Sequence, residues 1–74
     1  MAHDRIEIRP DVMLGKPVVR GTRVTVEQVL RECALGQTAE QIAEQYPGLH
    51  PADVAAALAF AADYLGREVM IAAE

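Results

Sequence analysis

The spacing of hydrophobic and polar residues changes near residue 25 and divides the chain into a β part and a helical part. Ile6–Arg9, "IEIR", alternates apolar and charged residues with the period of two that is typical of a half-buried strand. The stretch "PVVRGTRV" is rich in valine and threonine and predicts a second β segment, interrupted at Gly21. After residue 25, apolar residues recur every three or four positions, as in amphipathic helices. The pattern therefore predicts a β segment over about residues 6–24 and three helices over about residues 25–66.

Gly21 leaves two arrangements open for the second β segment. If Gly21-Thr22 is the two-residue loop of a hairpin, glycine occupies the first loop position, as a type II′ turn requires. The alternative is a single strand that bends at the glycine. Both arrangements predict strand-like backbone on either side of Gly21. Both also leave open whether the β segments pair within one chain or across a dimer.

Two threonines mark the expected starts of the first two helices. Thr25 with Gln28, and Thr38 with Gln41, have the spacing of a capping box, in which each residue satisfies a free backbone N–H of the other. Gly36 is expected to end the first helix in a left-handed conformation. The side chains expected to face the core from these helices are Val26, Val29, Leu30, Cys33, Ile42 and Tyr46.

The third helix is expected to begin at Pro51, with Asp53 near its positive end, and to stop at Gly66. Its predicted buried stripe is Val54, Leu58, Ala61 and Leu65. The tail, residues 67–74, is compatible with a short strand, a frayed turn or a segment ordered by a partner. A tight turn at Pro47-Gly48 joins the second and third helices in the layout of a helix-turn-helix.

Length and composition predict one mainly α domain, residues 1–74, with a small core. A chain of this size buries only about 60% of the surface that its unfolded form exposes. Its apolar residues, 51% of the total, are mostly alanine and valine, with one phenylalanine and two tyrosines. The third helix is also coated with alanine. We therefore expect a homodimer, or a domain that docks on a partner.

The chemistry-bearing residues do not suggest an enzyme. Cys33 is the single cysteine and lies on an expected apolar face, so a structural role is predicted. His3 and His50 are far apart and lack a nearby ligand, so we expect no metal and no cofactor. The longest apolar run is too short to span a bilayer, and no leader-like stretch is seen. The expected location is the cytoplasm, with no membrane partner.

Charge is unevenly distributed. Residues 1–23 hold five of the seven basic residues but only three of the eleven acidic ones. The candidate partner- or anion-binding residues are Lys16, Arg20, Gly21, Thr22 and Arg23. In a hairpin, Arg20 and Arg23 would lie opposite each other, which is unfavourable unless an anion sits between them. The alternative is that these arginines are solvated or form internal salt bridges, for example with Glu27 or Glu44.

The helix-turn-helix layout suggests DNA binding as a function, but the residues of the third helix do not support this function. Residues 51–66 contain no lysine, arginine, asparagine or glutamine, and they include Asp53 and Asp63. Base edges and phosphates are read by the side chains that this segment lacks. Any DNA contact is therefore expected to come from the basic N-terminal segment.

The stretch "IEIRPDVMLGKPVVRGTRVTVEQVLRECALGQTAEQIAEQYPGLHPADVAAALAFAA" resembles the bacterial domain-of-unknown-function 433 family. The most specific part is "GKPVVRGTRVTVEQVL", followed at the right distance by G-x-T-x-E-x-I-A-E-x-Y-P. The resemblance implies a homeodomain-like helix-turn-helix fold behind a short β segment. The chain departs from the common pattern at Thr25 and Thr38-Ala39, where relatives often have proline, but threonine keeps the capping role.

The resemblance also implies a function. Members are often regarded as VapB-kind antitoxins of type II toxin–antitoxin pairs, whose partner is a small PIN-type nuclease with an acidic active site. The leading hypothesis is thus an antitoxin-like binding module that neutralises a PIN-type ribonuclease. The alternative is a DNA-binding autoregulator, in which two N-terminal segments of a dimer hold promoter DNA. A structural dimer without a toxin is the third possibility.

Overall fold

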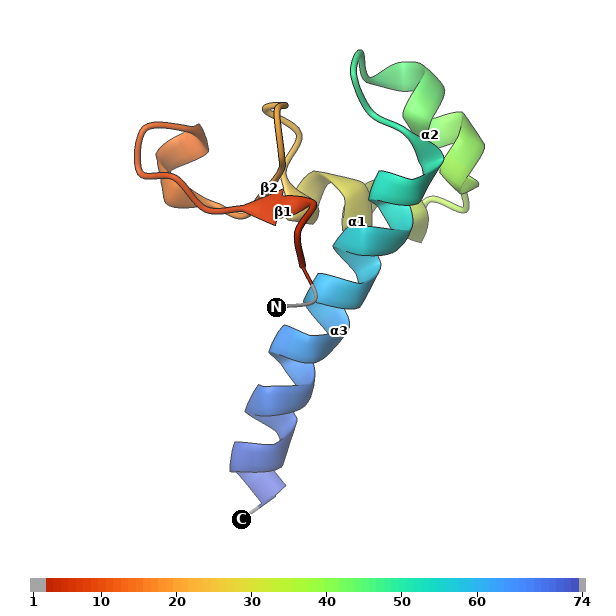
Figure 1. Ribbon diagram of the computed structural model, residues 1–74. Coiled ribbons are helices and arrows are strands. Elements are labelled where there is room, and N and C mark those ends of the chain that lie inside the picture. The colour runs from red at the N-terminus through yellow and green to blue at the C-terminus, as the bar shows by residue number, and fades with distance from the viewer. Residues whose placement is uncertain (1–2, 74) are drawn as a thin grey trace.

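Two short strands lie beside three helices in a computed structural model, which describes the backbone of residues 3–73 and the side chains of residues 3–66 (Figure 1). The elements in chain order are β1 (Ile6–Glu7), a single turn of 3-10 helix η1 (Met13–Gly15), β2 (Val18–Val19), α1 (Val26–Ala34), α2 (Ala39–Gln45) and α3 (Pro51–Ala73). The predicted fold class is confirmed: a mainly α, three-helix domain of the helix-turn-helix type that follows a short β hairpin.

The strands β1 and β2 pair antiparallel within the chain, with Ile6 opposite Val19 and Glu7 opposite Val18. The β segments therefore pair within one copy in this structure. β1 is shorter than the predicted "IEIR", because the chain turns after it: the Val12 N–H donates to the Arg9 carbonyl. The hairpin is thus only two residues deep on each side, and its long connection carries residues 8–17.

The loop after β2 has strand-like backbone on both sides, as predicted, but the turn is not the type II′ turn of the two-residue hairpin alternative. The Thr22 N–H donates to the Val19 carbonyl at 3.0 Å, which makes Gly21 the third residue of the turn. Gly21 has φ +80°, as the third residue of a type II turn requires. The Thr22 hydroxyl donates to the same Val19 carbonyl and accepts from the Val24 N–H, so the loop spans four residues rather than two.

The helix caps follow the sequence closely. Thr38 begins α2 with the complete capping box that was predicted. Thr25 accepts from the Gln28 N–H at 2.9 Å, but the Gln28 side chain does not bond to the Thr25 backbone. The capping box at the start of α1 is therefore only half formed. The Gln28 side chain donates to Glu32 and to the Tyr46 hydroxyl instead, while Tyr46 donates to Glu32. These bonds connect α1 to the end of α2.

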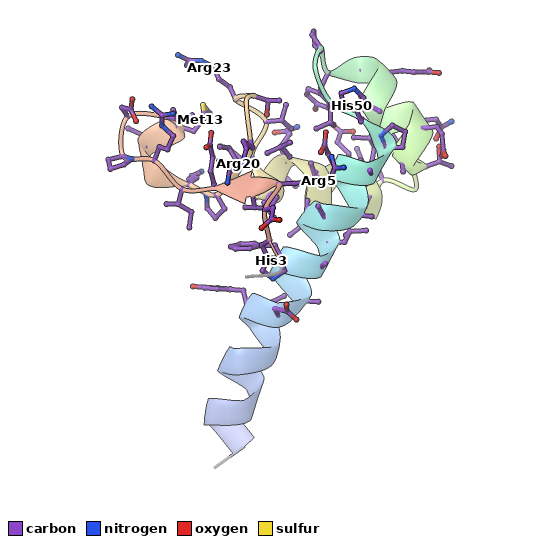
Figure 2. The ribbon with its side chains drawn as sticks, in the orientation of Figure 1. His3, Arg5, Met13, Arg20, Arg23 and His50 are labelled. Atoms are coloured by element: carbon purple, nitrogen blue, oxygen red, sulfur yellow. The ribbon has the colours of Figure 1, made fainter. Side chains whose placement is uncertain are left out.

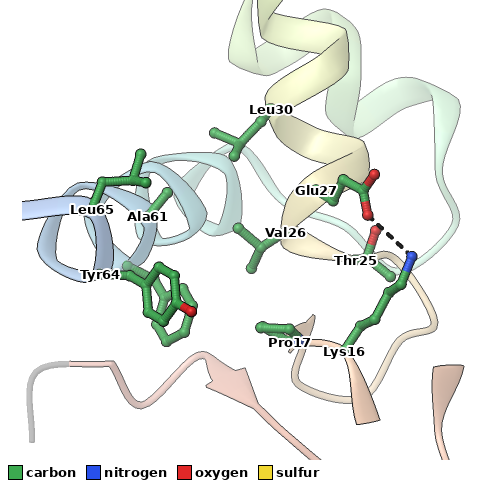
Figure 3. Close-up of a pocket in the computed structure, with 10 residues that line it drawn as sticks. Lys16, Pro17, Thr25, Val26, Glu27, Leu30, Ala61, Tyr64 and Leu65 are labelled. Carbon is green, nitrogen blue, oxygen red and sulfur yellow. Dashed lines mark hydrogen bonds and ion pairs between the residues drawn. The ribbon is translucent and has the colours of Figure 1, made fainter. Parts of the chain in front are cut away.

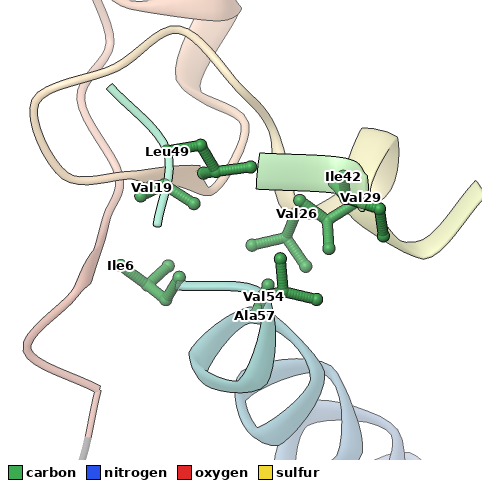
Figure 4. Close-up of a cluster of buried hydrophobic side chains, with 8 residues drawn as sticks. All are labelled: Ile6, Val19, Val26, Val29, Ile42, Leu49, Val54 and Ala57. Carbon is green, nitrogen blue, oxygen red and sulfur yellow. The ribbon is translucent and has the colours of Figure 1, made fainter. Parts of the chain in front are cut away.

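The hydrophobic core lies where the hairpin meets the first halves of the three helices (Figure 4). Its buried members are Ile6, Val19, Val26, Val29, Ile42, Leu49, Val54 and Ala57. All are aliphatic and most are small. Phe60 and Tyr46 are only partly buried and pack against this cluster from outside. The core is therefore small, as the composition predicts.

The third helix differs from its prediction in length and in its buried face. α3 does not stop at Gly66 but continues to Ala73, because Gly66 keeps a helical rather than a left-handed conformation. A glycine inside a helix costs about 1 kcal/mol without ending it. The tail is accordingly helical as far as it is described, and Glu74 lies outside the described residues. Val54 and Ala57 are buried, whereas Leu58 and Leu65 of the predicted stripe are exposed.

A buried carboxylate connects the start of the hairpin to the start of α3. Asp53 is only 4% exposed. Its Oδ2 accepts from the His50 N–H and its Oδ1 accepts from the Arg5 guanidinium, both at 2.9 Å (Figure 2). Burial by itself would raise the pKa of the Asp53 carboxyl, but the His50 N–H and the Arg5 charge together lower it below its ordinary value.

Replacing this carboxylate should destabilise the fold. Asp53→Asn keeps the size of the side chain but removes the charge that Arg5 contacts, so we expect the free energy of unfolding at pH 7 to fall by about 1–3 kcal/mol. Urea unfolding followed by circular dichroism measures the loss. Asp11→Asn is the matched control, since Asp11 is exposed and pairs only with exposed Arg9; its effect should stay below about 0.5 kcal/mol.

The same variant has a defined pH signature. A lowered pKa in the folded state means that the Asp53 carboxylate contributes its full stability above the unfolded-state pKa, about 3.9. That contribution is lost as pH falls through the folded-state pKa. The stability difference between wild type and Asp53→Asn should therefore be fully present at pH 5 and shrink below about pH 4. A difference that grows as pH falls below about 4 would contradict this account.

Candidate functional site

The connection between β1 and β2 holds an unusual left-handed turn. Met13, Leu14 and Gly15 have φ of 48°, 59° and 81° in succession. Backbone bonds close the turn: the Gly15 N–H donates to the Val12 carbonyl and the Lys16 N–H to the Met13 carbonyl. For residues other than glycine, the left-handed conformation costs roughly 1–2 kcal/mol each. Two residues of this turn are therefore held in a conformation that their own backbones disfavour.

This turn exposes a large apolar side chain to water. Leu14 is 94% exposed, and Met13 is also exposed. Beside them is an open hollow of about 350 Å³. Its lining residues are Pro10, Asp11, Met13, Leu14, Lys16 and Arg23. We call the surface formed by Met13, Leu14, Lys16 and Arg23 the loop tip.

Arg20, a predicted site residue, forms hydrogen bonds within the chain. Its Nε donates to the Asp4 carbonyl at 2.6 Å and its Nη1 to the Glu7 carboxylate at 3.3 Å. Gly21 and Thr22 shape the turn that follows. Internal pairing was the alternative considered for the arginines, but the partners are Asp4 and Glu7 rather than Glu27 or Glu44. Arg20 therefore fastens β2 to the N-terminal segment.

Arg23 differs from Arg20. It is exposed at the end of the four-residue loop and forms no hydrogen bond or ion pair with any described residue. Figure 2 shows Arg20 directed toward β1 and Arg23 directed away from the domain. The two guanidinium groups thus form no common clamp in this structure. Whether either residue binds a partner stays a prediction.

Lys16, a member of the loop tip, connects it to α1. Its ammonium group donates to Glu27 at 3.1 Å, and Arg31 contacts the other oxygen of the same carboxylate at 2.8 Å. The bond to Arg31 and the bond to Lys16 hold the pKa of the Glu27 carboxyl below its ordinary value. All three side chains are about half-exposed or more, and such surface pairs contribute little to stability. Lys16 can therefore exchange Glu27 for another carboxylate at small cost.

An apolar groove opens where α3 leaves the body of the domain (Figure 3). It has a volume of about 260 Å³. Its apolar lining residues include Pro17, Val26, Leu30, Ala61, Tyr64 and Leu65, and the Lys16–Glu27 pair lies at its rim. We call it the α3 groove. It was not foreseen, because only the fold brings residues 16–30 beside residues 60–65.

Metal-binding and nucleophilic residues form no cluster in the part of the chain that the structure describes. No group of three or more histidine, cysteine, aspartate or glutamate side chains there is placed to hold a metal ion. His3 Nε2 lies 2.8 Å from Asp63, and its ring packs edge-on against Phe60. Cys33 is partly buried against the core. His3 therefore connects the N-terminal segment to α3.

Among the described residues, no helix has both the length and the apolar character needed to cross a lipid bilayer.

The fold and its surface define a small helix-turn-helix domain with an exposed loop tip. The family described as "Protein of unknown function (DUF433)" matches residues 6–61, and the chain belongs to this family. The chain is also similar to "Uncharacterized protein y4eO" of Sinorhizobium fredii, with 42% identity over 48 residues, which are 65% of this chain and 22% of that protein. It thus spans about a fifth of that relative. No solved structure matches it significantly.

The strain at Leu14 can be measured. Leu14→Gly relieves the left-handed strain and removes no buried contact, since the side chain is exposed. After subtraction of the extra chain entropy of glycine, we expect a gain of about 0.5–1 kcal/mol in the free energy of unfolding. Leu35→Gly is the matched control: Leu35 is 76% exposed but has φ −81°. It should lose stability. A loss of stability in Leu14→Gly would show that the turn is not strained.

Proposed function

We propose that this chain is an antitoxin-like binding module, and that it neutralises a PIN-type ribonuclease by covering the nuclease surface with its loop tip. One observation carries the proposal: an almost fully exposed leucine, held in a left-handed turn, lies in the same hollow as two basic side chains. Backbone strain of this kind persists where the surrounding structure enforces it, and it clusters at binding and active sites.

The chemistry of the loop tip suits a protein surface that carries carboxylates. Leu14 supplies an apolar anchor that a partner can bury. Arg23 has no described internal partner, and a guanidinium group binds carboxylates through two parallel hydrogen bonds. Arginine is among the residues that most often dominate the binding energy of an interface. PIN-type active sites, as the family resemblance implies, are clusters of acidic residues.

The hairpin gives this surface a fixed position. Arg20 fastens β2 to the segment before β1, and Arg5 fastens the same segment to α3. A surface that is already ordered loses little conformational entropy on binding. The chain is acidic after residue 24, so its charge asymmetry also orients an acidic partner toward the basic end.

The alternative, a helix-turn-helix DNA-binding autoregulator, has less support. Residues 51–66 of α3 include no basic residue, and Asp53 at the start of the helix is paired with Arg5. DNA contacts would have to come from the loop tip and the other N-terminal arginines. Such binding would weaken steeply with added salt, in proportion to the phosphates contacted.

The test is inhibition of a purified PIN-type nuclease, taken from the reading frame next to the gene for this chain if that frame encodes one. Cleavage of a fluorogenic RNA by the purified nuclease should fall to background when the wild-type chain is added in equimolar amount. Arg23→Glu should weaken inhibition at least about tenfold, since it places like charges together. Arg20 is left intact because its bonds support the fold.

Arg31→Glu is the charge-matched control, since Arg31 is an exposed arginine of α1 paired within its own helix. It should inhibit like the wild type. Absence of inhibition by excess wild-type chain would refute the proposed function. Equal inhibition by the wild type and Arg23→Glu would refute the loop tip as the contact surface.

A further inference from the structure

The distal part of α3 has no packing partner within the chain. Residues 62–66 are all exposed, and the helical backbone continues to Ala73, away from the body of the domain (Figure 1). Tyr64 and Leu65 are 54% and 56% exposed. A helical segment of about a dozen residues is marginal in water when it stands alone. A partner that packs against its exposed residues would stabilise this segment.

An apolar strip lies beside this free helix. The α3 groove occupies one side of Tyr64. A second hollow, of about 550 Å³, includes Ile8 and shares Pro17, Phe60 and Tyr64 with the groove. On α3 itself, Leu58 and Leu65 lie seven residues apart and thus on one face of the helix, and both are exposed. Groove and helix face form one continuous apolar surface.

We propose that a second copy of this chain covers the strip. The two α3 helices pack antiparallel about a two-fold axis near Leu65 and Gly66, and the distal part of each helix lies in the α3 groove of the other copy. The proposal does not depend on the proposed nuclease partner. Composition alone predicts a dimer without indicating its interface, whereas the proposal names the face that forms it.

The length of α3 fits this arrangement. From Leu65 to the end of the helix at Ala73 is eight residues, or about 12 Å. From Leu65 back to Ala57, which is fully buried in the core, is also eight residues. In an antiparallel pair, Ala73 of one helix therefore lies beside Ala57 of the other, where that second helix becomes buried in its own domain. At Gly66, an added Cβ would meet nothing within the chain, so this position leaves room for close approach of a second helix.

Charge also favours a second copy. A two-fold interface brings each surface patch against itself, so a charged patch would be repelled by its own copy. Between Pro51 and Gly66, the exposed face of α3 carries one charge, Asp63, and His3 lies against it at 2.8 Å. The charges at the rim of the α3 groove, Lys16 and Glu27, are paired with each other. The strip is thus almost neutral on a chain whose net charge is −4.

The experiment uses the protein alone. Sedimentation equilibrium of the wild-type chain at 10–100 µM should give twice the chain mass of 8.0 kDa. Leu65→Glu should give the mass of one chain, because two carboxylates would be buried at the axis. Its side chain is half-exposed in one copy, so circular dichroism should still show a folded helical protein. Leu35→Glu, at an exposed leucine outside the strip, should stay dimeric.

A cross-link locates the axis independently. In a Cys33→Ala background, Leu65→Cys should form a disulfide-linked dimer on mild oxidation, because the two copies of residue 65 meet at the axis. Leu35→Cys should not. A wild-type mass of 8.0 kDa at 100 µM would overturn the proposal. A Leu65→Glu dimer, or equal cross-linking at residues 35 and 65, would do the same.

Discussion

The contact between Arg5 and Asp53 is the interaction on which the rest of the structure depends. Two residues 48 positions apart meet at a buried carboxylate, which also accepts the free N–H of His50 at the start of α3. Without this contact, a hairpin only two residues deep would have little to hold it against the helices. With it, Ile6 is fixed over the core and completes a cluster that is otherwise formed by the helices and β2.

Two surfaces of different character follow from this anchoring. The loop tip is basic and carries Leu14 in a disfavoured conformation, while residues 62–66 in the distal part of α3 expose Tyr64 and Leu65 and carry one charge, Asp63. They lie at different ends of the molecule, as Figure 1 shows for η1 and the end of α3. A dimer formed through α3 would contact Lys16 at the rim of the α3 groove but leave Met13, Leu14 and Arg23 of each loop tip free, so that one dimer presents two binding surfaces.

Local signals in the sequence predicted where the helices begin, whereas long-range contacts could not be predicted from it. Thr38 predicted its helix start, because capping depends on residues three positions apart. The Arg5–Asp53 pair carries no local signal. Leu14 was missed since left-handed turns are expected at glycine or asparagine, and only the closed hairpin enforces one here. The predicted end of α3 at Gly66 was wrong, because glycine ends a helix only where its backbone is left-handed, and Gly66 stays helical.

The central claim is that a rigid hairpin presents the loop tip as the binding surface. The most direct test is titration of the ¹⁵N-labelled chain with a catalytically inactive form of the proposed partner, a PIN-type nuclease, followed by amide resonances. The account predicts that the largest changes fall on residues 12–16 and 22–24, with little change over residues 51–58. Changes concentrated along α3, with the amides of the loop tip unmoved, would contradict it.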